Sequence, residues 1–141
     1  WFNRVGVVQL RLESIEALGP AAGPAIPPLQ NLNLHTLPSG HPAALLVGMA
    51  GRSHWSASVE ATAGHATLQF DIACRHLPQP EWLGSRYRVV GDSANRVNIV
   101  ADDGRLNYTA DIATIEPTAI NENSPTTRWR YAVSIRLNSD L

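Results

Sequence analysis

From His54 to Leu137, polar and apolar residues alternate with a period of two, and the alternation breaks mainly at residues that favour turns. Successive side chains of a β-strand point to opposite faces, so this pattern is typical of an antiparallel sheet with one apolar face. Such a sheet must cover that face with a second sheet or close on itself. The pattern therefore predicts an all-β fold, an antiparallel meander of about 7–8 strands that forms a sandwich or an up-and-down barrel-like domain.

Turn-forming residues suggest how these strands pair. Three hairpins keep the apolar side chains on one face, which a slip of one residue would destroy. The third uses Asp103-Gly104, a favoured two-residue hairpin turn. The turn at 63–64 pairs Val59 with Leu68, the loop at 92–94 pairs Val89 with Val97, and the turn at 103–104 pairs Ala101 with Leu106. A final strand from Arg128 to Leu137 turns Trp129 and Tyr131 inward.

The residues before this stretch are harder to interpret. Six of the ten prolines lie between residues 19 and 42, so we expect a long, irregular Pro/Gly-rich connection at 19–43. It is either mobile or packed down, and leucines such as Leu32 and Leu34 favour packing. Residues 1–18 fit both helical and strand spacing. Because Val-Gly-Val-Val favours strand, we expect a strand through Leu12. The length predicts one domain over 1–141.

Composition narrows the class of partner. Charged residues make up 16% of the chain, the net charge is −1, and all eleven cations are arginine. A nucleic-acid-binding protein would be expected to show a basic face, so we predict no nucleic-acid partner. No stretch approaches the ~20 apolar residues of a membrane span. Because the chain begins with Trp1 and not with Met, we expect a processed or excised protein, with an extracytoplasmic or periplasmic location favoured.

The sequence carries no signature of a metal or catalytic site. The single cysteine, Cys74, falls on the apolar face, where a thiol behaves as an inert core side chain. His54, His65 and His76 recur at equal intervals, but the predicted hairpin places them on different faces and ends. Three such ligands cannot close on one ion, so we expect neither metal nor cofactor.

Two polar groupings remain as candidates. Asp71 lies across from Ser56 and diagonal to His54 in the predicted hairpin, and we interpret this as solvated cross-strand pairing. Arginines on the outer face form the second grouping, which could accept an acidic ligand or dock a protein partner. Its alternative is an ordinary solvated face. The members are Arg75, Arg86, Arg88, Arg128 and Arg130.

Trp82 is the one aromatic residue in a connection, the proline-rich segment 77–84. Loops above a β-scaffold often carry contact residues, so Trp82 is a candidate for partner binding, with packing over an open end of the core as the alternative.

These observations predict a non-enzymatic interaction or structural module. Open sheet edges could also support a homodimer. One alternative is a small barrel that binds an apolar ligand. Its lining would be Trp55, Phe70, Tyr108, Trp129 and Tyr131. Another alternative is a pilin-like or secretion-apparatus subunit in which residues 1–18 are the truncated end of a helix.

Overall fold

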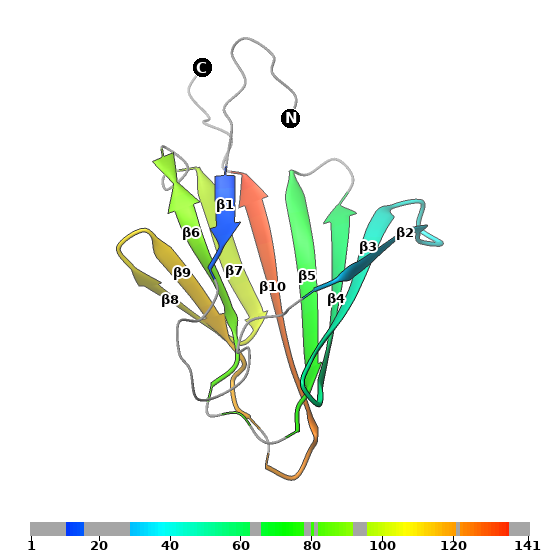
Figure 1. Ribbon diagram of the computed structural model, residues 1–141. Helices are drawn as coiled ribbons and strands as arrows, with labels where there is room; N and C mark the ends of the chain where they lie inside the picture. The colour runs from blue at the N-terminus through cyan, green and yellow to red at the C-terminus, as the bar shows by residue number, and fades with distance from the viewer. Residues whose placement is uncertain are drawn as a thin grey trace, which may run out of the picture.

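The computed structural model describes residues 11–15, 29–62, 66–77, 80, 82–91, 96–120 and 122–135. These residues form ten strands and no α-helix. The strands are β1 (Arg11–Ser14), β2 (Asn31–Thr36), β3 (Pro42–Ala50), β4 (Ser53–Thr62), β5 (Thr67–Arg75), β6 (Ser85–Val90), β7 (Val97–Asp103), β8 (Arg105–Thr109), β9 (Ile112–Glu116) and β10 (Thr126–Ile135) (Figure 1).

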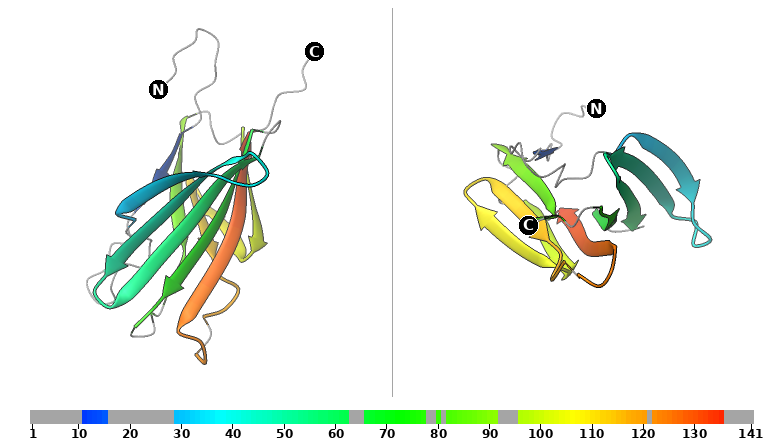
Figure 2. Two further views of the ribbon diagram at one scale, coloured as in Figure 1. Left: turned by 90° about the vertical axis from the view of Figure 1, so that its right-hand side faces the viewer. Right: turned by 60° about the horizontal axis from the view of Figure 1, so that its bottom comes forward.

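All pairings are antiparallel and fall into two sheets. One has four strands in the order β1-β6-β9-β8, and the other has six in the order β2-β3-β4-β5-β10-β7. The two sheets face one another as layers (Figure 2). The all-β prediction is therefore confirmed, and of the two expected architectures the structure is an open sandwich and not a closed barrel.

The first predicted hairpin forms with a longer turn. In β4 and β5, Val59 faces Phe70 and not Leu68, because residues 63–66 separate the last pair of the ladder. The shift equals two residues, which is one full period of the strand. Every side chain therefore keeps its predicted face although its partner changes.

The other two predicted hairpins are wrong. β6 pairs with β1 and β9, β7 pairs with β10, and β8 pairs with β9. The chain thus crosses between sheets both after β6 and at Gly104, so the simple meander ends at β5. Stacking two sheets buries an apolar face of each, which placing the strands side by side in one open sheet would not do. Alternation alone cannot distinguish these arrangements.

The proline-rich region also differs from expectation. Residues 31–36 and 42–50 form β2 and β3, so the second half of the predicted irregular connection is a hairpin. Its predicted packing through Leu32 and Leu34 is wrong, because both side chains are exposed. Proline has no backbone N–H, and Pro42 occupies a position where none is needed for pairing with β2. It faces Thr36, next to the hydrogen-bonded pair of Leu37 and His41, and such positions alternate along the ladder. In the first segment, Leu12 lies in β1 as expected, and residues 1–10 and 16–28 lie outside the described residues.

The core lies where the two sheets overlap. Trp129 and Tyr131 of β10 are fully buried, which confirms their inward orientation. Tyr108 faces Ala113 in the β8–β9 ladder and so has the predicted parity, but it is 55% exposed because β8 is the edge strand of the four-stranded sheet. The buried cluster comprises Trp55, Ala57, Ile72, Cys74, Leu83, Val97, Ile99, Ala113, Ile115, Trp129 and Tyr131.

Cys74 is fully buried in this cluster, as predicted. Burial raises the pKa of its thiol from 9.0 to about 12. The unfolded thiol ionises first as pH rises, so the stability that the neutral thiol contributes is complete below about pH 9 and is lost toward the folded-state pKa. We expect the free energy of unfolding to fall by about 1.4 kcal/mol between about pH 8 and pH 10 through this group.

Urea titrations across that range test this expectation, with Cys74→Ala as the control that removes the thiol. Burial also raises the pKa values of Tyr87 and Tyr131 above 10.0, so the wild type and Cys74→Ala should both lose further stability at higher pH. An equal pH dependence in the two proteins between about pH 8 and pH 10 would contradict the assignment to Cys74.

Candidate functional site

The five candidate arginines do not share one face. Three lie on the six-stranded sheet and two on the four-stranded sheet, because β6 and β10 belong to different layers. The predicted common arginine face is therefore wrong as a single surface. Arg75, Arg128 and Arg130 lie on β5 and β10, whereas Arg86 and Arg88 lie on β6.

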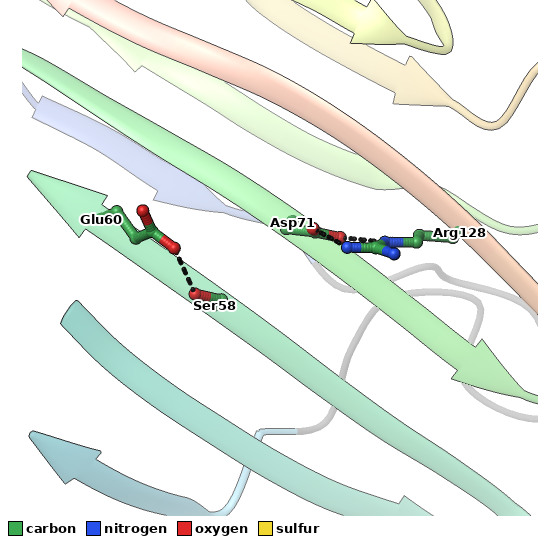
Figure 3. A network of polar contacts seen from close by, with 4 residues as sticks. All are labelled: Ser58, Glu60, Asp71 and Arg128. Carbon is green, nitrogen blue, oxygen red and sulfur yellow. Dashed lines mark hydrogen bonds and ion pairs between the residues drawn. The ribbon is translucent and has the colours of Figure 1, made fainter. Parts of the chain in front are cut away.

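Arg128 is paired within the protein. Its guanidinium donates to both carboxylate oxygens of Asp71, with Nε 2.6 Å from Oδ1 (Figure 3). This bidentate contact raises the pKa of Arg128. Asp71 faces Ser58 in the ladder, whereas Ser56 faces Ala73, so the predicted Ser-His-Asp grouping does not form. The Ser58 hydroxyl instead donates to Glu60 at 3.4 Å.

The arginines of β6 also have partners. Arg88 Nε lies 3.4 Å from Asp111 Oδ2, and the Arg86 guanidinium carbon lies 5.1 Å above the ring centre of Trp82. The Trp82 indole N–H donates to Glu116 Oε1 at 2.7 Å. Trp82 thus contacts the four-stranded sheet twice, through its ring with Arg86 and through its indole nitrogen with Glu116. These contacts favour packing over partner binding for this residue.

The described residues offer little catalytic geometry. Among them, no three His, Cys, Asp or Glu side chains are arranged to hold a metal ion. His76 is buried, and its Nε2 lies 3.1 Å from the Thr127 hydroxyl. In the same part of the chain, no helix has the length and apolar character to cross a membrane.

A different surface stands out, the β2–β3 hairpin. Residues 17 to 51 contain no Asp, Glu, Lys or Arg. β3 is apolar on both faces, and β2 is exposed along its whole length. In Figures 1 and 2 these strands lie away from β8 and β9, at the side where the second sheet does not cover the first. The exposed apolar side chains are Leu32 (58%), Leu34 (77%), Leu45 (40%), Val47 (45%) and Met49 (52%).

β2 also differs from the other three sheet edges. The edge strand β1 carries Arg11 and Glu13, β8 carries Arg105, and β7 carries Asp102 and Asp103. Charged side chains on an edge discourage pairing with another chain. Among the edge strands that the structure describes, β2 alone carries no such charge.

Among the described residues, β2 has a strand partner on one side only, so the backbone groups of its other side have no ladder partner there. Leu37 N donates to the carbonyl of His41 at 2.9 Å, which sets the hydrogen-bonded positions of the β2–β3 ladder. Because these positions alternate, residues 31, 33 and 35 bond to β3, and Leu32, Leu34 and Thr36 point their N–H and C=O groups outward. Their side chains share the inner face with Leu46 of β3.

Two apolar cavities adjoin the inner face. One of about 390 Å³ lies beside β2 and is lined in part by Leu34, Ala44 and Val59. A larger one of about 550 Å³ lies at the open end between the sheets. Its lining includes Ala66 and Ile135, which adjoin residues 63–65 and 136–141 outside the described part of the chain. Of the residues predicted to line a ligand cavity, Phe70 lines this one, whereas Trp55, Trp129 and Tyr131 are buried in the core.

Comparisons with known protein families, with curated proteins and with solved structures return no match. A functional assignment therefore has to come from the chain's own residues.

Sequence reasoning missed β2 because the surrounding prolines indicated an irregular connection. Two signals could have identified it: the Asn-Leu-Asn-Leu alternation of residues 31–34 and the absence of charge from 17 to 51. That its leucines remain exposed depends on the extent of the other sheet, which no local pattern reports.

Proposed function

We propose that this protein is a non-enzymatic interaction module that binds an extended strand of a partner on the free edge of β2. The observation that carries the proposal is an exposed edge strand without a charged side chain. Some domains bind an extended peptide as an additional strand on a sheet edge. Backbone hydrogen bonds then give the affinity, and pockets for alternate side chains of the peptide give the specificity. Here Leu32, Leu34 and Thr36 supply the outward backbone groups.

The surroundings of β2 favour an uncharged, apolar partner strand. Leu32 and Leu34 project from the inner face, and β3 adds Leu45, Val47 and Met49 on the opposite face. Burying these side chains removes apolar surface from water at no cost of desolvating a charge. A partner strand in which small apolar and neutral residues alternate matches this surface.

Residue-resolved amide exchange by NMR tests the proposal. A capped, uncharged peptide of alternating valine and threonine should slow exchange at Leu32, Leu34 and Thr36, whose N–H groups it would engage. The same peptide with its alternate amides methylated lacks the pairing donors and is the matched control. In the protein, Leu34→Pro removes one outward N–H and spares the ladder to β3, so it should weaken peptide binding. Unchanged exchange along β2 of the monomeric protein at millimolar peptide would reject the proposal.

The pilin-like alternative required a helix over residues 1–18. Arg11–Ser14 form β1 instead, and the remaining positions lie outside the described residues apart from Ile15.

A further inference from the structure

The strand that fits the β2 edge most fully is β2 itself. We propose that β2 pairs with β2 of a second copy of the chain, antiparallel about a twofold axis at Asn33, so that the two six-stranded sheets become one. This inference rests on the proposed function, because it uses the same edge and names its occupant.

Backbone geometry restricts the register. The outward groups belong to the even-numbered residues of β2, so only a register that places even residues opposite even residues forms hydrogen bonds. An axis at Asn33 pairs Leu32 with Leu34 of the second copy, and Leu34 with Leu32 of the second copy. An axis at Leu34 would instead place Leu32 opposite Thr36. The first register stacks both leucines of each strand on leucine, and it is therefore the one we infer.

Charge favours this partner over pairing at another edge. A self-paired β7 would bring Asp102 and Asp103 of two copies together, and β1 and β8 also carry full charges. In contrast, on the outer face of the β2 pair Asn33 would face Asn33 of the second copy, and Asn31 would face His35 of the second copy. No like charges would be brought together there. The interface is isologous, as a twofold dimer requires.

Analytical ultracentrifugation of the full chain over a range of concentrations is the first test. We expect a reversible dimer whose dissociation constant rises at least about tenfold in Leu34→Lys, because the introduced ammonium would lose water in the leucine layer. Val100→Lys is the matched control, since Val100 is 47% exposed on β7, the opposite edge of the same sheet. This control should dimerise like the wild type.

Cysteine cross-linking tests the register. Asn33 would face its counterpart at a position without hydrogen bonds, where Cα atoms are about 4.5 Å apart and within disulfide range. Asn33→Cys should therefore form a covalent dimer with diamide. In His35→Cys the two cysteines would lie about four residues apart along the strands, roughly 14 Å, and should not cross-link. Cys74 does not interfere, because it is fully buried and the pKa of its thiol is about 12.

A wild-type protein that stays monomeric, a dimer that survives Leu34→Lys, or a dimer in which His35→Cys cross-links better than Asn33→Cys would each overturn the inference. The peptide experiment separates this failure from that of the proposed function. A monomer whose β2 amides are still protected by the peptide retains the strand-binding edge and rejects only the second copy. A monomer without that protection rejects both.

Discussion

Trp129→Phe should destabilise the protein more than Trp55→Phe does, by about 1–3 kcal/mol, although both replace a buried indole by a smaller ring. The two rings contact one another edge to face, with centroids 6.2 Å apart, and both are at most 2% exposed. Their nitrogens differ. Trp129 Nε1 donates to the Ser85 hydroxyl at 3.1 Å, whereas Trp55 Nε1 is buried without a partner among the described residues.

The physical reason is the group left behind. Trp129→Phe takes the indole donor away from the buried Ser85 hydroxyl, while Trp55→Phe removes a donor that was already unsatisfied. Both variants also lose apolar volume, which costs a comparable amount in each. Urea unfolding gives the two free energies. Equal losses, or a larger loss in Trp55→Phe, would mean that the bond between the sheets contributes nothing.

Trp129→Ala sets the upper limit of this series, with an expected loss of about 3–5 kcal/mol. The side chain is completely buried on β10, where Trp129 faces Ile72 of β5, and its neighbours come from both sheets. Because a loss of this size is a large part of a domain's usual stability, the variant should be partly unfolded at neutral pH.

Gly104→Ala should cost about 2–4 kcal/mol. Gly104 adopts φ +154°, and a Cβ built on it would lie 2.5 Å from the carbonyl oxygen of Glu116 in β9. A backbone atom at this distance cannot rotate away, so β9 or the crossing itself must shift. Urea unfolding measures the loss, and amide exchange at the β8–β9 pair shows whether it is local.

Gly51→Ala is the matched control, because it separates backbone strain from lack of space. Gly51 also has a positive φ, +58°, but a Cβ there would meet nothing within 4 Å. It should cost only about 1–2 kcal/mol, the usual price of a left-handed conformation. A loss in Gly104→Ala no greater than this would contradict the close approach of β9, and with it the crossing between sheets at Gly104.

In β4, β5 and β10, period-two alternation was sufficient to predict the strands and which side chains face the core. Trp129, Tyr131 and Cys74 are buried as their parity requires, and the β4–β5 pair keeps its faces despite a two-residue shift. These properties are local. Side-chain direction follows from the pleat of the strand, and a buried face needs apolar residues whatever layer covers it.

Which strands are neighbours was decided only by the tertiary structure. Asp103-Gly104 has the composition of a hairpin turn, yet Gly104 serves a crossing between sheets, because stacking β7 and β8 in separate layers buries apolar faces that a single sheet would expose. The candidate arginines of β6 and of β10 lie on different sheets for the same reason. The exposed edge of β2 likewise depends on where the four-stranded sheet ends. Alternation reports only that a face is apolar, and the packing of the whole chain determines what covers it.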